Sequence, residues 1–108
     1  MIDAPEISVD ELAQWFESDK PFTLLDVRED DEFAFASIDG SMHVPMRQVR
    51  KRLGEIPKGK PIVVICHVGE RSAYVARALI ATGLPDVYNL AGGIDAYSAF
   101  IDPAIPRY

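Results

Sequence analysis

The sequence of 108 residues holds few of the residue types that several functions require. It has one cysteine, which excludes an internal disulfide, and two histidines. Together these are too few and wrongly spaced for a closed zinc site. No apolar run approaches the roughly 20 residues that span a bilayer, and the first residues lack the basic and apolar regions of a signal peptide. We therefore expect no metal, no membrane segment and a cytoplasmic location.

Positive charge is also scarce, since 11 Lys and Arg stand against 17 Asp and Glu and give a net charge of −6. Proteins that bind nucleic acids non-specifically need basic patches to displace phosphate counterions, so we expect no nucleic-acid partner. The hydrophobic fraction of 48% and the charged fraction of 26% are typical of a globular protein. The length predicts a single domain over 1–108, with a core at about 6–101 and an irregular tail at 102–108.

Short strands and helices are predicted to alternate along the chain. Ser8 and Glu11 have the spacing of a capping box and predict a helix that runs to about Ser18. The run 61–66 is apolar and β-branched, which is typical of a strand buried on both faces of a parallel sheet. Alternation predicts an α/β fold, a small and mainly parallel sheet flanked by helices on both faces. The other predicted strands are 22–27, 41–44 and 87–90, and the other predicted helices are 29–35, 46–53, 73–81 and 94–100.

Cys66 ends the central apolar strand, just before the helix for which Ser72 is the predicted N-cap. In open α/β sheets, sites form at the carboxyl ends of strands, beside helix N-termini. Gly69 would let the loop turn its backbone N–H groups inward as a nest for an anion. The helix N-terminus and Arg71 both favour a thiolate, so Cys66 is the predicted nucleophile, although a lone cysteine on an apolar strand is also commonly an inert thiol. The predicted substrate-binding loop is His67, Val68, Gly69, Glu70, Arg71 and Ser72.

Three motifs then resemble the rhodanese (sulfurtransferase) family. They are Cys66-x-x-Gly69-x-Arg71-Ser72, Leu25–Glu29 and Leu90–Ile94, and the resemblance extends from Ile7 to Tyr97. It implies the rhodanese fold and a cysteine that takes a sulfane sulfur from a donor such as thiosulfate or a persulfide. Cys66 would hold that sulfur as a persulfide and pass it to a thiophilic acceptor, cyanide in vitro or a thiol in vivo, with no cofactor. Ser37 stands where many members carry a histidine, and Tyr97 where a tryptophan is common.

Two other functions stay open. Cysteine phosphatases with this fold use Cys-x5-Arg, whereas four residues separate Cys66 from Arg71. The shorter loop suits one terminal sulfur better than a phosphoryl group. The other alternative is a non-turnover persulfide carrier or interaction module. The basic residues Arg47, Arg50 and Lys51 could dock an acidic sulfur donor or acceptor protein, or form a solvated helix face.

Three further polar residues, Asp26, Arg28 and His67, have two interpretations each. Asp26 and Arg28 end an apolar strand and could form a buried hydrogen-bonded pair, the interpretation we favour for Asp26; Arg28 could instead line the mouth of the site and attract anions. His67 could tune the thiolate or be a half-exposed loop residue. His43 is predicted to be structural. The pair Gly92-Gly93 is predicted to allow close backbone approach and helix entry.

Overall fold

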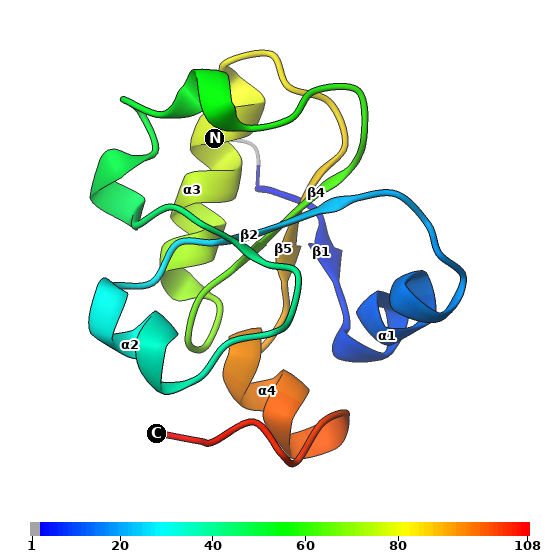
Figure 1. Ribbon diagram of the computed structural model, residues 1–108. Coiled ribbons are helices and arrows are strands. Elements are labelled where there is room, and N and C mark those ends of the chain that lie inside the picture. Colours follow the sequence, from blue (N-terminus) through cyan, green and yellow to red (C-terminus); the bar gives the residue numbers. More distant parts are fainter. Residues whose placement is uncertain (1–2) are drawn as a thin grey trace.

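The computed structural model describes residues 3–108, and in that range five short strands form one parallel sheet in the order β1-β5-β4-β2-β3 (Figure 1). The strands are β1 (Glu6–Ile7), β2 (Thr23–Asp26), β3 (Met42–His43), β4 (Ile62–Ile65) and β5 (Val87–Leu90). The helices are α1 (Val9–Glu17), α2 (Asp30–Phe35), α3 (Glu70–Ala81) and α4 (Gly93–Phe100). The predicted fold class, a parallel sheet with helices on both faces, is confirmed.

The core lies on both faces of the sheet because β4 is buried on both. Side chains alternate between the faces of a strand. Val63 and Ile65 therefore pack with residues of α1 and α4, while Ile62 and Val64 pack with residues of α3. Figure 1 shows the same division, with α3 on one side of the sheet and α1 on the other. Cys66 belongs to the cluster on the α3 side.

The helix α1 begins as the sequence predicts. Ser8 Oγ accepts the Glu11 N–H at 3.1 Å, and Glu11 Oε1 accepts the Ser8 N–H at 3.1 Å, so two otherwise unpaired amide groups are satisfied. Leu12 is fully buried in the core, and Trp15 packs edge-to-face against Phe22 and Tyr88. No helix within residues 3–108 is long and apolar enough to cross a bilayer.

Three predictions about the elements are wrong. The segment 46–53 is not an α-helix; it holds the 3-10 turn Met46–Gln48 and runs into the 3-10 turn Leu53–Glu55. The β-branched Val49 and Gly54, which lies inside the second turn, both have low α-helical propensity. The N-cap of α3 is Gly69, and Ser72 is a fully buried residue of the first helical turn. The core does not end at 101, since Ile105 of the tail is 8% exposed and packs into the cluster on the α1 side.

Candidate active site

The cysteine loop lies where the chain changes direction across the sheet. After β2 the chain moves outward to β3, and after β4 it moves the opposite way to β5, although β2 and β4 are neighbours. Such a point leaves a crevice at the carboxyl ends of the two strands. Arg28 follows β2 and Cys66 follows β4, so residues far apart in the sequence meet at this edge.

The Cys66 sulfur is enclosed by the loop. The residue is 1% exposed, and its Sγ accepts the Gly69 N–H at 3.1 Å and lies 3.2 Å from Ser72 Oγ. Gly69 has φ of +104°, a left-handed conformation that turns its amide toward the sulfur and begins α3. The N-terminus of a 12-residue helix therefore faces Cys66, and its dipole favours negative charge there.

The loop is held from behind by the backbone of α4. The N–H groups of Ile94 and Asp95 donate to the carbonyl oxygens of Cys66 and His67 at 2.9 and 3.0 Å. A Cβ atom on Gly93 would lie 2.4 Å from the His67 oxygen, so only glycine allows this approach. The prediction that the double glycine serves close backbone approach and helix entry is confirmed.

Arg71 is bound to a carboxylate of α2. Its guanidinium donates two hydrogen bonds to Glu32, at 2.7 and 2.9 Å, and so ties the start of α3 to α2. These hydrogen bonds raise the pKa of Arg71 and lower the pKa of Glu32 to about 2. The positive charge at the loop is therefore matched by a fixed negative charge.

Arg28 does not line the mouth of the site. It is fully buried and forms a bidentate pair with Asp26, which is also fully buried, with Nε donating to Oδ1 and Nη2 to Oδ2. Its remaining N–H groups donate to the carbonyl oxygens of Glu32 and Ala36 and to the Tyr108 hydroxyl. Every charge of this pair is satisfied internally, as the structural interpretation of Asp26 requires.

The tail reaches the cysteine loop through Tyr108. Its ring stacks on His67 with the ring centroids 4.0 Å apart, and its hydroxyl accepts from Arg28 and donates to Glu32, both at 2.9 Å. His67 Nε2 is buried and has no hydrogen-bond partner within the described residues. Val68 is 49% exposed and Glu70 is exposed, so the outer side of the loop faces solvent.

His43 supports the strand ends and lies outside the loop. Its Nε2 is 2.7 Å from the Arg28 carbonyl oxygen, and its ring stacks on Phe33. Both contacts agree with the structural role predicted for it.

A second hydrogen-bond network lies behind the sulfur. Ser72 Oγ is 2.5 Å from Asn89 Oδ1, and Asn89 Nδ2 donates to the Gly69 carbonyl oxygen at 3.1 Å and to Glu6 at 3.3 Å. Asn89, Glu32 and Tyr108 were not predicted from the sequence to belong to the site. Only Asn89 carried a signal, since it is a polar residue in the otherwise apolar strand β5.

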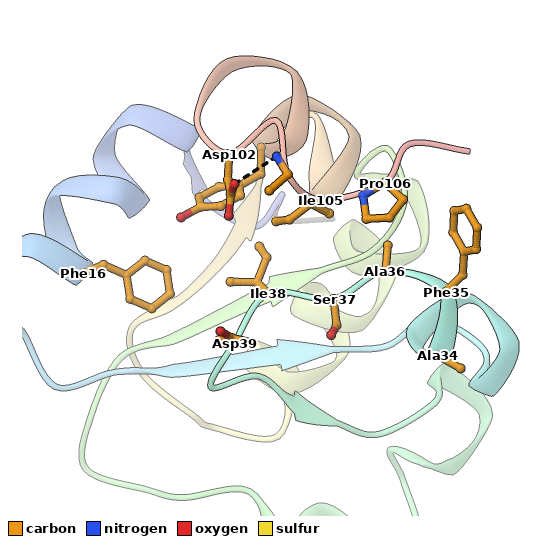
Figure 2. A pocket seen from close by; sticks show the side chains of 12 residues that line it. Phe16, Ala34, Phe35, Ala36, Ser37, Ile38, Asp39, Asp102, Ile105 and Pro106 are labelled. Carbon is orange, nitrogen blue, oxygen red and sulfur yellow. Dashed lines mark hydrogen bonds between the residues drawn. The ribbon is translucent and has the colours of Figure 1, made fainter.

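A separate pocket of about 430 Å³ lies between the tail and residues 34–39 (Figure 2). Figure 2 shows Asp102, Ile105 and Pro106 of the tail facing Ala36, Ser37 and Ile38. None of its lining residues belongs to the cysteine loop. Ser37, which stands in place of the expected histidine, therefore lines a pocket that is separate from the loop around the sulfur.

Known proteins are similar to most of this chain. The model of the family "Rhodanese-like domain" matches residues 8–100. A thiosulfate sulfurtransferase of Shewanella oneidensis, GlpE, is 32% identical over 91 residues, which are 84% of this chain and 89% of that protein. A chloroplastic rhodanese-like/PpiC domain-containing protein 12 of Arabidopsis thaliana is 43% identical over 89 residues, 79% of this chain and 30% of that protein.

Solved structures agree with the sequence comparisons. A rhodanese-like domain protein from Staphylococcus aureus superposes with a TM-score of 0.83 at 31% identity, covering 96% of this chain and 98% of that one. The chain spans 49%, 30% and 62% of the lengths of three curated relatives, the Arabidopsis protein among them, so several relatives are considerably longer. The order of the motifs, the parallel sheet and these matches lead to one conclusion: the chain belongs to the rhodanese-like domain family.

Proposed function

We propose that this chain is a sulfurtransferase that moves a sulfane sulfur from thiosulfate or a persulfide donor, through a persulfide on Cys66, to a thiophilic acceptor. One observation carries the proposal. The Cys66 sulfur lies at the carboxyl end of the central strand, accepts the Gly69 N–H at 3.1 Å and faces the N-terminus of α3. A thiolate in this position has a fixed donor and a helix dipole to stabilise its charge.

The transfer needs two displacement steps. The Cys66 thiolate attacks the sulfane sulfur, a new S–S bond forms, and the donor S–S bond breaks with its electron pair leaving on sulfite or a thiolate. An acceptor thiolate, or cyanide, then attacks the outer sulfur and releases the Cys66 thiolate. Neither step adds or removes electrons overall, so these residues need no redox cofactor for the exchange.

The charges at the loop favour a persulfide donor over thiosulfate. Arg71 is paired with Glu32, and Arg28 is paired with Asp26. Glu70 and the acidic first turn of α2 lie on the same side of the molecule as the loop and add negative charge. The dianion thiosulfate therefore meets little net positive charge here, whereas the persulfide group of a thiol persulfide carries only a single negative charge and is repelled less.

Intact-protein mass tests the proposal. Reduced protein is incubated with thiosulfate or with a low-molecular-weight thiol persulfide, and then with cyanide. We expect a gain of one sulfur that is lost as thiocyanate, about tenfold faster with the persulfide. Because Cys66 is the sole cysteine, Cys66→Ser is the matched control and should gain nothing. Folded protein that takes up sulfur from neither donor would contradict the proposal.

A protein-borne donor or acceptor is the second candidate, and a groove favours it. About 460 Å³ in volume, the groove runs between the segment 46–53 and α3, with Met46, Leu53 and Tyr74 on its walls and Arg50 among its lining residues. Arg47 is paired with Glu29, whereas within residues 3–108 Arg50 forms no ion pair. An acidic protein segment with an apolar anchor has the chemistry that fits this groove.

Peptide persulfides separate docking from chemistry. In the variant Arg50→Glu with Lys51→Glu, sulfur uptake from an acidic peptide persulfide should fall, while uptake from a small persulfide stays unchanged. A basic peptide persulfide serves as the opposite control and should react faster with the variant. Equal rates of all three donors with both proteins would exclude this docking surface.

A further inference from the structure

We infer that Asn89 is a positioning residue that directs the Ser72 hydroxyl proton away from the Cys66 sulfur and so favours the sulfur-loaded state. The inference rests on the proposed function, in which Cys66 carries the sulfur. It concerns a residue that the loop motif does not contain, since Asn89 lies on β5, 23 positions after Cys66 in the sequence.

Ser72 has one hydroxyl proton and two acceptors within reach. Its Oγ lies 2.5 Å from Asn89 Oδ1 and 3.2 Å from Cys66 Sγ. Ser72 is 0% exposed and Asn89 is 2% exposed, so water does not supply the missing hydrogen bond. The proton can serve only one acceptor at a time, and the nearer of the two is the amide oxygen.

The orientation of the Asn89 amide is fixed by two groups that can only accept. Its Nδ2 faces the Gly69 carbonyl oxygen at 3.1 Å and the Glu6 carboxylate at 3.3 Å. Turning the amide over would place its oxygen against both of these oxygens. The nitrogen therefore stays on that side, and the oxygen stays turned toward Ser72.

This arrangement acts on the charge of the sulfur. When Ser72 donates to Asn89, its oxygen presents a lone pair to Sγ. That lone pair can accept the S–H of the free thiol, and it repels the negative charge of a thiolate. The inner sulfur of a persulfide is neutral, so the lone pair repels it less than it repels the thiolate. Gly69 N–H then supports the thiolate without help from Ser72. The free thiolate is left less stabilised, and loading removes the charge from the inner sulfur.

The pH dependence of alkylation by iodoacetamide tests the inference, because only the thiolate reacts. In Asn89→Ala the Ser72 hydroxyl is free to donate to the thiolate. The midpoint should therefore move to lower pH by roughly half to one unit, the value of one neutral hydrogen bond. In a Ser72→Ala background, Asn89→Ala should leave the midpoint where Ser72→Ala alone puts it. A midpoint that stays or rises in folded Asn89→Ala overturns the inference.

A milder variant covers the case in which Asn89→Ala does not fold. Glu6 is exposed, and Glu6→Ala removes one of the two groups that orient the amide. It should shift the midpoint in the same direction by a smaller amount, and an unmoved midpoint counts against the inference. Persulfide loading is measured separately by intact mass. Protein that alkylates as expected but loads no sulfur would contradict the proposed function, while the effect of Asn89 on the Ser72 proton and the thiolate would still be supported.

Discussion

At the residue scale, Arg71 stabilises the cysteine loop by its two hydrogen bonds to Glu32 of α2. We expect Arg71→Ala and Glu32→Gln each to lower the free energy of unfolding by about 1.5 kcal/mol, the value of charge-assisted hydrogen bonds in a partly buried place. The double variant should lose less free energy of unfolding than the sum of the two single variants, because both changes remove the same contact. Urea denaturation of the two single variants and the double variant measures these losses. Arg77→Ala, on the same helix and without an ion pair within residues 3–108, is the matched control; strictly additive losses would contradict the coupling.

Gly93 is required for two reasons that can be separated. Its φ is +61°, and a Cβ atom would meet the His67 oxygen at 2.4 Å. Gly83 has a φ of +98° but open space around it, so Gly83→Ala measures the backbone strain alone, about 1 kcal/mol. We expect Gly93→Ala to lower the free energy of unfolding, measured by heat or urea, by at least about 2 kcal/mol more than Gly83→Ala, because backbone atoms must move to make room for the Cβ atom. Equal losses in the two variants would show that the backbone around Gly93 adjusts to a Cβ atom at little cost.

At the element scale, the contact between α2 and α3 should respond to acid. Hydrogen bonds from Arg71 lower the Glu32 pKa from 4.5 to about 2. A carboxyl with a lowered pKa contributes stability above its unfolded value and loses it as the pH falls toward its folded value. The contribution of this contact should thus be complete above about pH 5 and decline between pH 4.5 and 2. As the pH is lowered from 4.5 to 2, the free energy of unfolding should fall less steeply in Glu32→Gln than in the unmodified protein. Parallel curves for the two proteins would contradict this role of Glu32.

The elements that the sequence predicted correctly have local signals. The capping box of α1 and the β-branched run of β4 involve neighbours in the sequence, and both are found as predicted. Ser72 shows the limit of such signals. Serine is a favoured N-cap, but the left-handed Gly69 begins the helix three residues earlier and leaves Ser72 buried against the sulfur.

The partners of the site could not be predicted for a related reason. Glu32 is 39 residues from Arg71 and Asn89 is 17 residues from Ser72, and only the packing of the sheet brings each pair together. The place of Cys66 just after a buried strand was predictable, because the apolar run 61–66 marks that strand. The sequence therefore locates the proposed nucleophile, while the hydrogen bonds to its sulfur depend on tertiary structure.

At the scale of the whole molecule, the tail is part of the core. Ile105 is 8% exposed, and its carbonyl oxygen accepts the Ser98 hydroxyl at 2.6 Å. We expect Ile105→Ala to lower the free energy of unfolding by about 2–4 kcal/mol, as for a core residue elsewhere. Phe100 is 77% exposed, and Phe100→Ala should change it by less than about 0.5 kcal/mol. Chemical denaturation with Trp15 fluorescence measures both, and a similar small loss for Ile105→Ala would show that the tail packs only loosely.

The tie between Arg71 and Glu32 also has a kinetic consequence. With a net charge of −6, and with Arg71 and Arg28 each paired to a carboxylate, the protein repels a dianion at long range. Added salt shortens the Debye length, to about 10 Å at 0.1 M, and weakens that repulsion. Sulfur uptake from thiosulfate should accordingly accelerate as ionic strength rises, the reverse of a site that steers anions inward, and uptake from an uncharged organic trisulfide should hardly change. Rates of sulfur uptake, measured by stopped flow at increasing sodium chloride concentration, therefore show whether the electrostatic potential around the loop attracts or repels an anionic donor.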